Sequence, residues 1–346
     1  MTPSPTRVLV AMSGGVDSSV AAALLRDAGH DVTGVTLKLW GGESDSGCCS
    51  AADVEDARRV AAQLDIPHYV FNFADEFDSR VVGPYVDAYA DGRTPNPCVE
   101  CNRSIKFGRL LERADALGFA AVATGHHARV RRDTGGSWQL LRGSDVAKDQ
   151  SYVLYMLGQA ELGRTLLPVG ELTKAQVREH AARLGLRTAG KAESMDVCFI
   201  TRGGREEFVS ARAGASPGTV VDGDGAVIGR HDGVTGFTIG QRRGVGVATG
   251  ERRYVVDLDA ATATVTLGRR DDLLRDAVNL RDLCFVDGAP GPADRVDVQV
   301  RAHGAPMEGR LDGTCVWFER PQPRVAPGQV VALYDGDTLL GGGTAT

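Results

Sequence analysis

The fold of this chain is decided by the stretch Arg7-Val-Leu-Val-Ala-Met-Ser-Gly-Gly-Val-Asp-Ser-Ser-Val20. Its apolar run Val8–Met12 predicts a buried parallel strand, and the alanine-rich segment Val20–Ala28 predicts a helix. Between them lies a glycine turn, where the outward backbone N–H groups and the helix dipole favour an anion. Gly14 and Gly15 allow the backbone to approach a ligand closely. The stretch therefore predicts a phosphate site at a strand-to-helix turn.

The turn is not a Walker A loop, because no Gly-Lys-Ser/Thr follows it. Ser13–Ser19 resembles the PP-loop of ATP pyrophosphatases instead. The resemblance implies cleavage of ATP between its α- and β-phosphates and transfer of AMP to an oxygen of the substrate. A plain glycine turn capped by serine is the alternative. Asp17 has two candidate roles, a Mg²⁺ ligand or a cap of the helix at Ser18–Val20.

The length and composition describe an ordinary globular protein with more than one hydrophobic core. The chain has 346 residues, 42% of them hydrophobic and 24% charged, which predicts two or three domains. No apolar run approaches a membrane span and residues 1–6 lack a signal-peptide core, so we expect a cytoplasmic protein without a membrane partner. Seven cysteines, an odd number, favour working thiols over a disulfide scaffold. The net charge of −6 argues only weakly against nucleic acid.

Strand and helix signals alternate over residues 7 to about 200, which predicts an open parallel α/β sheet. The expected strands are Val8–Met12, Asp31–Leu39, His68–Phe73 and Ala120–Thr124, and the expected helices are Ser19–Ala28, Ala51–Leu64, Phe77–Ala90 and Ile105–Leu117. Such sheets bind ligands at the carboxyl ends of their strands. Ser13–Ser19 and Thr124–His127 are both expected at that edge.

The composition changes after about residue 202. All five lysines precede this point, and short alternating runs follow it. These runs are Arg253–Leu258, Thr264–Leu267, Val296–Arg301 and Val330–Tyr334. They predict one or two small β domains with a joint near Arg269–Leu274.

A second strong signal is Thr94–Arg103, where two prolines shape a loop and Cys98-Val-Glu-Cys101 is expected to open a helix beginning near Ser104. A thiol at such a helix start, beside Arg103 and Lys106, favours the thiolate. Cys198 lies far along the chain in the run Ser194–Ile200. A zinc knuckle would need a second CxxC pair, which is lacking, and a buried inert Cys198 is the plain alternative. The functional hypothesis is that two thiols meet over the nucleotide, one carrying sulfur and the other attacking or reducing it.

Two further segments receive modest predictions. Cys48 and Cys49 adjoin the expected helix from Ala51 and are expected to be loop or cap residues. Gly185–Ala192 nearly spells a Walker A motif, but it ends in alanine and has no hydroxyl for Mg²⁺, so we expect a helix-ending turn.

The motifs together resemble those of bacterial tRNA-specific 2-thiouridylases, over nearly the whole chain and in the family's order. They are SGGVDSS, NPCVECN, ATGHHAR, KDQSY, SMDVCFI, TIGQRRGVGV and PGQVVALYDGD with LGGGT. The resemblance implies that a PP-loop catalytic domain spans residues 1–202, a central tRNA-contacting domain 203–272 and a C-terminal β-barrel 273–346. It implies ATP-dependent 2-thiolation of the wobble uridine of tRNA, with Mg²⁺ and a persulfide-carrying sulfur donor protein.

The resemblance also implies roles for individual residues. Cys101 matches the family nucleophile, Cys198 matches the cysteine that takes up sulfur as a persulfide, and Asp17 joins them as a catalytic candidate. The residues expected at ATP are Ala11, Met12, Ser13, Gly14, Gly15, Val16, Asp17, Ser18, Leu37 and Gly125. The residues expected at tRNA are Asn96, Pro97, Cys98, His126, Lys148, Asp149, Gln150 and Gln329.

A basic cluster adds a prediction made from charge alone. Arg242 and Arg243, with Arg252 and Arg253, flank a glycine-rich loop, and we expect Arg242 and Arg243 to contact tRNA phosphates. For Arg252 and Arg253 an ordinary solvated face is an equal alternative.

The chain departs from some relatives at Cys98, where they carry aspartate, and at Arg301-Ala302, which replaces a more aromatic pair. A third thiol leaves open a cluster-dependent thiolase with iron and sulfur on Cys98, Cys101 and Cys198. Two other classes remain: a PP-loop amidating ligase for a small metabolite, and a metal- or cluster-binding RNA module without catalysis. The ligase leaves both cysteines without a task.

Overall fold

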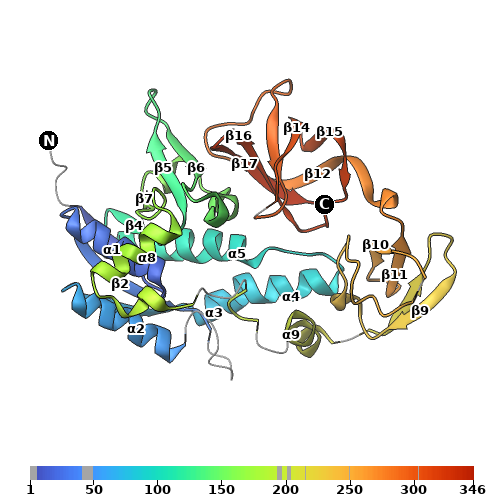
Figure 1. The fold of residues 1–346 in the computed structure, drawn as a ribbon, viewed down its shortest axis with the longest axis horizontal. Coiled ribbons are helices and arrows are strands. Elements are labelled where there is room, and N and C mark those ends of the chain that lie inside the picture. The colour runs from blue at the N-terminus through green and yellow to red at the C-terminus, as the bar shows by residue number, and fades with distance from the viewer. Residues whose placement is uncertain are drawn as a thin grey trace.

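The structure is a computed structural model that describes residues 6–40, 50–192, 197–200, 204–214, 216–248, 250–302 and 304–346. Figure 1 shows an N-terminal α/β lobe, a C-terminal barrel and a smaller β lobe beyond it, connected beneath by a long helical rod. Cys48, Cys49 and the first residues of the Cys198 motif, Ser194, Met195 and Asp196, lie outside the described residues. In the described part of the chain, no helix is long and apolar enough to cross a bilayer.

The first lobe is built on a parallel sheet, as predicted. Its strand order is β3-β2-β1-β4-β7, and every neighbouring pair is parallel. The strands are β1 (Arg7–Ala11), β2 (Asp31–Lys38), β3 (His68–Asn72), β4 (Ala121–Ala123) and β7 (Thr165–Leu166). Side chains alternate across β1, so Val8 and Val10 enter one core and Leu9 enters the other. The sheet is therefore covered on both faces.

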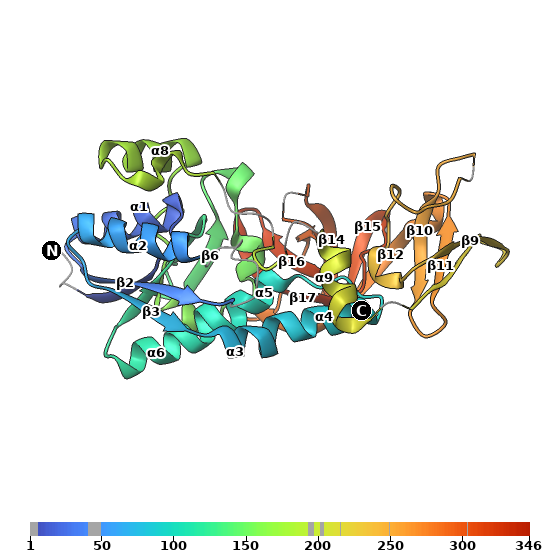
Figure 2. The same cartoon turned by 90° about the horizontal axis from the view of Figure 1, so that it is seen from below.

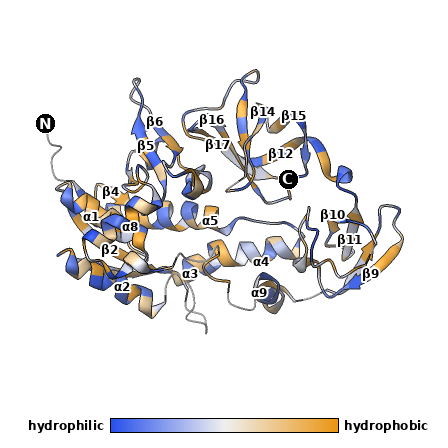
Figure 3. Ribbon diagram, viewed as in Figure 1, coloured by the Kyte–Doolittle hydropathy of each residue, from blue (hydrophilic) through white to orange (hydrophobic). Residues whose placement is uncertain are grey.

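Helices form the two outer layers (Figure 2). One face carries α1 (Val16–Asp27) and α2 (Ala51–Gln63), with α8 (Lys174–Arg183) against α1. In Figure 3 hydrophobic colour gathers on α1 and the strands of this lobe. The shorter helical turns of this lobe are η3 (Val146–Lys148), η4 (Ser151–Leu154), α7 (Gln159–Leu162) and η5 (Arg187–Gly190).

Two helical rods cover the opposite face, and both begin earlier than predicted. The first runs through α3 (Ala74–Phe77), the π-helical stretch η1 (Asp78–Val82) and α4 (Gly83–Ala90). The second runs through α5 (Pro97–Glu100), the π-helical stretch η2 (Cys101–Arg109) and α6 (Leu110–Ala116). The expected helix start near Ser104 is wrong, because the Asn96 side chain caps the helix by accepting from the Cys98 N–H at 3.1 Å.

The middle lobe is a four-stranded sheet of order β10-β11-β8-β9. Its strands are β8 (Gly218–Val221), β9 (Val227–His231), β10 (Tyr254–Asp259) and β11 (Thr264–Gly268), with the short turn η6 (Val234–Gly236). The expectation of β structure alone after residue 202 missed α9 (Gly204–Ala213). This helix packs Phe208 against Trp40 and Phe199, so it belongs to the first lobe's aromatic core.

The C-terminal lobe is a barrel of six strands, closed by pairing of β12 with β17. After the turn η7 (Asp271–Leu273) come β12 (Leu274–Phe285), β13 (Val296–Gln299), β14 (Met307–Asp312), β15 (Cys315–Pro323), β16 (Val330–Asp335) and β17 (Thr338–Ala345). The hairpin β5 (Ala128–Arg132) and β6 (Trp138–Arg142) leaves the first lobe and pairs with β17. The sequence pattern did not predict this hairpin, which joins the lobes through one sheet.

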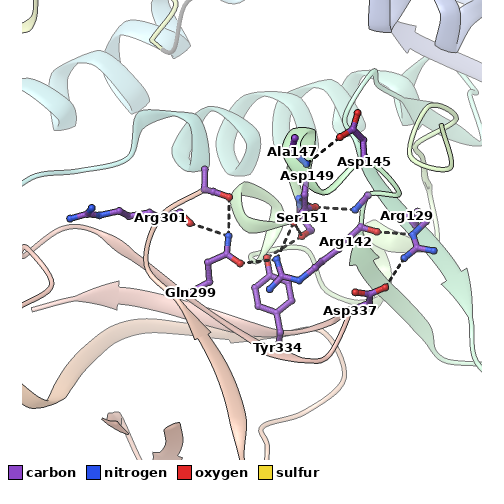
Figure 4. A network of polar contacts seen from close by, with 12 residues as sticks. Arg129, Arg142, Asp145, Ala147, Asp149, Ser151, Gln299, Arg301, Tyr334 and Asp337 are labelled. Atoms are coloured by element: carbon purple, nitrogen blue, oxygen red, sulfur yellow. Dashed lines mark hydrogen bonds and ion pairs between the residues drawn. The ribbon is translucent and has the colours of Figure 1, made fainter. Parts of the chain in front are cut away.

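A buried polar network fastens the hairpin to the barrel (Figure 4). Asp149, only 3% exposed, accepts from the Gly143 N–H at 3.0 Å and from Arg142 Nη1 at 3.2 Å. Arg142 also donates to Gln299 Oε1 at 2.7 Å and stacks on the Tyr334 ring, 3.7 Å from its centroid. The pairing satisfies charges that would otherwise be costly to bury.

We predict that Asp149→Ala lowers the free energy of unfolding by about 3–5 kcal/mol, because it leaves the Arg142 charge unpaired in a buried site. The measurement is urea denaturation of the full chain. The control is Asp337→Ala at the same interface, whose carboxylate is 67% exposed and pairs with Arg129 at 3.1 Å. That change should cost at most about 1 kcal/mol. Equal losses in the two variants would contradict the prediction.

Candidate active site

The loop between β1 and α1 has the backbone geometry predicted for close approach. Gly14 has φ of +72°, and a Cβ there would lie 2.3 Å from the Asp53 carbonyl oxygen. Only glycine fits this position. Helix α1 begins after Gly15 without a side-chain cap, so the expectation that Asp17 caps this helix is wrong.

The loop serines bind one another and the loop backbone. Ser18 Oγ accepts from the Ser13 N–H at 3.2 Å and donates to the Gly15 carbonyl at 3.2 Å. Ser19 Oγ donates to the same carbonyl at 2.8 Å. Ser18 and Ser19 are buried, whereas Ser13 is exposed at the mouth of the loop. Ser13 is therefore the serine positioned to meet a ligand from outside.

The carboxyl end of β4 closes against the same loop. A Cβ on Gly125 would lie 2.6 Å from the Ser18 backbone nitrogen. Met12 and Leu37 are buried at the ends of β1 and β2, where the Thr36 hydroxyl donates to the Met12 carbonyl at 2.8 Å. The two loops expected at one edge of the sheet do meet there.

Asp17 is paired with two groups from other elements. Lys174 Nζ lies 2.8 and 2.7 Å from its two carboxylate oxygens, and His127 Nε2 lies 3.1 Å from Oδ1. Burial by itself raises the pKa of Asp17, but hydrogen bonds from His127 and Lys174 outweigh it and bring the pKa below its usual range. Asp17 is therefore held as a carboxylate in the loop.

His126 and His127 lie inside the protein. His126 Nδ1 is 2.7 Å from the Thr124 hydroxyl, and the His126 ring is buried. Burial, helped by the charge of Lys106, brings the pKa of His126 well below its usual range. The neutral ring faces the interior, so contact with tRNA would require a different arrangement of this segment.

The cysteine loop is held by the barrel. The Thr94 N–H donates to the Pro327 carbonyl at 2.7 Å, and Gln329 Nε2 donates to the Thr94 carbonyl at 2.8 Å. Pro97 is buried, while Asn96 and Cys98 are half-buried. The structure thus brings Gln329 against Thr94, two residues before Asn96 in the same loop.

Cys98 and Cys101 lie in successive turns of the second rod. Cys98 is in the first turn, where the N-terminal dipole acts, whereas Cys101 is buried one turn further in the π-helical stretch η2. The electrostatic help expected for a thiolate at the helix start therefore falls on Cys98. Cys101 instead belongs to the large hydrophobic cluster of the first lobe.

Cys198 is half-buried and packs against that same cluster. Its neighbour Phe199 anchors the segment, with ring centroids 5.2 Å from Tyr85, 5.3 Å from Phe208 and 5.7 Å from Phe77. Ala11, at the end of β1, also packs against this cluster. Among the described residues, no group of three or more Cys, His, Asp or Glu side chains is placed to hold a metal ion.

The KDQSY segment divides into an exposed and a buried part. The Gln150 side chain is exposed and accepts from the His127 N–H at 2.9 Å, and Lys148 is half-buried. Asp149 lies in the interface network of Figure 4, where its carboxylate binds protein groups. A direct contact of Asp149 with tRNA does not fit this arrangement. The Asp149 carboxylate instead binds neighbouring groups of the protein.

The expected basic cluster divides as well. Arg242 and Arg243 are exposed on a loop whose glycines Gly240, Gly244 and Gly246 have φ between +71° and +83°. Arg253 is ion-paired with Glu251. Arg242, Arg243 and Arg252 are therefore the exposed arginines of the predicted cluster, whereas Arg253 is half-buried.

Two lysines near the loop escaped the sequence analysis. Lys174 is the first residue of α8, and Lys191 Nζ contacts the Gly14 carbonyl at 3.0 Å, Asp53 at 2.6 Å and Asp56 at 2.8 Å. The segment Gly185–Ala192 does contain a helical turn, η5, as predicted. Lys191, which follows this turn, contacts the nucleotide loop. The only sequence signal was a lysine in each segment, and nothing local indicated its partner.

We predict that stability falls as the pH drops from 7 to 5. The unfolded chain protonates His126 near pH 6.5 while the folded chain keeps it neutral, so the unfolded state binds more protons. This group contributes a slope of at most about 1.4 kcal/mol per pH unit. Urea denaturation across this range should show a smaller slope for His126→Asn and an unchanged slope for the control His180→Asn on α8. An unaltered slope in His126→Asn would contradict the assignment.

Models of three families match successive parts of the chain. They are described as a tRNA methyl transferase HUP domain (residues 6–202), a tRNA methyl transferase PRC-barrel domain (206–269) and an aminomethyltransferase beta-barrel domain (275–345). Together with the parallel sheet and the closed barrel, they confirm the predicted fold class.

Curated relatives match over nearly the full length of both chains. A tRNA-specific 2-thiouridylase MnmA of Chloroflexus aggregans is 52% identical over 97% of this chain and 97% of its own. The one of Moorella thermoacetica is 47% identical over 97% and 98%. A solved complex of a 4-thiouridine synthetase with RNA and ATP is 18% identical, with a TM-score of 0.38 over 56% of this chain and 44% of that one. From the full-length matches, this chain belongs to the tRNA-specific 2-thiouridylase family.

Proposed function

We propose that this chain uses ATP to replace the C2 oxygen of the wobble uridine of tRNA with sulfur. The observation that carries the proposal is the shared cluster that contains Cys101 and packs against Cys198 and against Ala11, at the start of the nucleotide loop. The names of the full-length relatives support the same reaction. Measuring 2-thiouridine by mass spectrometry after incubation of tRNA with the protein, ATP, Mg²⁺ and a persulfide donor tests it.

The first step solves a leaving-group problem. The uracil C2 oxygen attacks the α-phosphorus of ATP, pyrophosphate leaves, and the oxygen becomes part of an adenylate that can depart as AMP. The proposed ATP residues are Ala11 to Ser18, Leu37 and Gly125, of which Gly14 and Gly125 are the close backbone approaches. Mg²⁺ is bound by one or two carboxylates together with phosphates, and Asp17 would be its ligand, neutralising phosphate charge.

The second step transfers sulfur to C2 of the uracil, and two cysteine thiols supply the electrons for it. A donor protein first transfers sulfur to Cys198 as a persulfide. The terminal persulfide sulfur attacks C2, and the Cys101 thiolate attacks the inner sulfur of Cys198, so the S–S bond of the persulfide breaks. AMP leaves with the former C2 oxygen, the products are 2-thiouridine and a Cys101–Cys198 disulfide, and a thiol reductant restores both thiols.

The tRNA surface is proposed from residues on three elements. Asn96, Pro97 and Cys98 would face the target base, Gln329 would join them from the barrel, and Lys148 and Gln150 would lie on the next exposed segment. Arg242 and Arg243 would contact phosphates from the middle lobe. The anticodon loop is unpaired, so the target base leaves its stack at small cost. We place the protein in the cytoplasm, where its tRNA substrate is found.

The alternative activities give different outcomes in the same assay. An amidating ligase would release pyrophosphate with a small metabolite and not with tRNA, and an RNA module without catalysis would release none. An iron–sulfur thiolase would need Cys98, Cys101 and Cys198 as a ligand set, and the described residues do not form one. The matching family description refers to tRNA methyl transfer. Methylation would add a CH₂ to the mass of the nucleoside, whereas thiolation exchanges an oxygen for a sulfur.

We predict that Cys198→Ser and Cys101→Ser each abolish 2-thiouridine while pyrophosphate release with tRNA continues, because adenylation precedes sulfur transfer. Nucleoside mass spectrometry and a pyrophosphate assay measure the two steps. Cys315→Ser, which removes a half-buried thiol on β15, is the control and should leave both unchanged. Thiouridine made by Cys198→Ser from a persulfide donor would remove Cys198 from the reaction.

We also predict that the double change Arg242→Ala, Arg243→Ala weakens tRNA binding and lowers the dependence of log K on log salt by about two, because each phosphate contact releases about one counterion. Binding titrations at several salt concentrations measure the slope. The matched control is Arg58→Ala, Arg59→Ala, an adjacent pair on α2 that already pairs with Glu55. A slope equal in both double variants would count against the proposed contact.

A further inference from the structure

Lys174 places an ammonium inside the proposed nucleotide loop. Its Nζ lies 2.8 and 2.7 Å from the two Asp17 oxygens, and the lysine side chain is 13% exposed. Asp17 belongs to the first turn of α1, where phosphates are expected. A lone carboxylate there would repel a triphosphate, and Lys174 neutralises that charge at the same point.

The backbone of Lys174 is fixed by its surroundings. Thr173 caps α8, with its N–H donating to Gln176 Oε1 at 2.8 Å, and the Lys174 N–H donates to Asp145 Oδ2 at 2.9 Å. Val177 and Ala181 of the same helix pack into the core that α1 shares. The fixed start of α8 therefore places the long lysine side chain at the loop.

Lys191, in the segment that follows α8, has a different set of partners from Lys174. Its ammonium is held by the Gly14 carbonyl, Asp53 and Asp56 together. Hydrogen bonds to the two carboxylates outweigh burial and raise its pKa. Lys191 ties the back of the loop to α2, whereas Lys174 lies at Asp17, on the helix end that faces the ligand.

We propose that Lys174 is a nucleotide-contacting residue, whose ammonium bridges Asp17 and a phosphate oxygen of ATP when the nucleotide binds. This rests on the ATP site of the proposed function. Before the nucleotide binds, the ammonium is paired with Asp17. In the complex it interacts with both Asp17 and the phosphate, and Asp17 positions the ammonium. The competing explanation is that Lys174 only neutralises Asp17.

The test compares ATP with adenosine by calorimetry on the full chain, in EDTA so that Mg²⁺ plays no part. Lys174→Met should weaken ATP binding about 10- to 100-fold, the range expected for one charged hydrogen bond. Adenosine binding should stay within about twofold, because that ligand has no phosphate. Lys174→Arg, which keeps the charge, should retain most of the ATP affinity.

The double variant Asp17→Asn, Lys174→Met separates the two explanations. If Lys174 only neutralises Asp17, this uncharged pair restores wild-type ATP affinity, and the inference is wrong. If Lys174 contacts phosphate, ATP binding stays weak while adenosine binding shows that the site is intact. Arg183→Gln, an exposed change on the same helix, is the control and should bind ATP as wild type does.

The remaining outcomes are also decisive. A parallel loss of ATP and adenosine binding in Lys174→Met would mean that the lysine only supports the fold of the site. Normal ATP binding in Lys174→Met, with a wild-type chain that binds ATP, would overturn the inference alone. A wild-type chain that binds neither ligand would overturn the ATP site of the proposed function as well.

Discussion

The parallel pairing of β1 with β2 on one side and β4 on the other is the constraint on which the rest of the structure depends. It places the carboxyl ends of three strands along one edge, so that the loops after β1 and β4 touch. The contact is backbone to backbone, since a Cβ on Gly125 would lie 2.6 Å from the Ser18 nitrogen. A change in register by one residue would bury the wrong face of β1 and separate these loops.

The barrel is part of the candidate site because it forms hydrogen bonds with the segments on both sides of that site. On one side Pro327 and Gln329 hold the Thr94 backbone beside the cysteine loop. On the other, β17 pairs with β6, and Arg142 joins Asp149 to Gln299 and Tyr334. The segments proposed to meet tRNA are therefore positioned against each other through the barrel, and a catalytic domain cut at residue 202 would lose these supports.

The sequence predicted what is local and periodic, and failed where distant segments meet. Strands β1, β2, β3 and β4 and the glycine loop follow from alternation and turn chemistry, and the structure has them within a residue or so, but the short strand β7 was not predicted. The helix start at Pro97 was missed because Asn96 and Pro97, both good start signals, were read as loop residues. The pairing of the β5–β6 hairpin with β17 and the Asp17–Lys174 pair were beyond reach, since each depends on residues more than 150 positions apart, such as Leu140 with Leu339 and Asp17 with Lys174. The hairpin itself is local, and the sequence analysis missed its two short strands.

The electrostatics of the loop explain how one carboxylate can serve a phosphate site. Asp17 is paired with Lys174 and hydrogen-bonded to His127, so its charge is compensated before any ligand arrives. In the proposed ATP complex, the triphosphate would meet an ammonium whose partner is already in place, which would avoid the reorganisation that a solvated lysine needs. In that complex the ammonium would bridge Asp17 and a phosphate oxygen, so the loop would not present uncompensated negative charge to ATP.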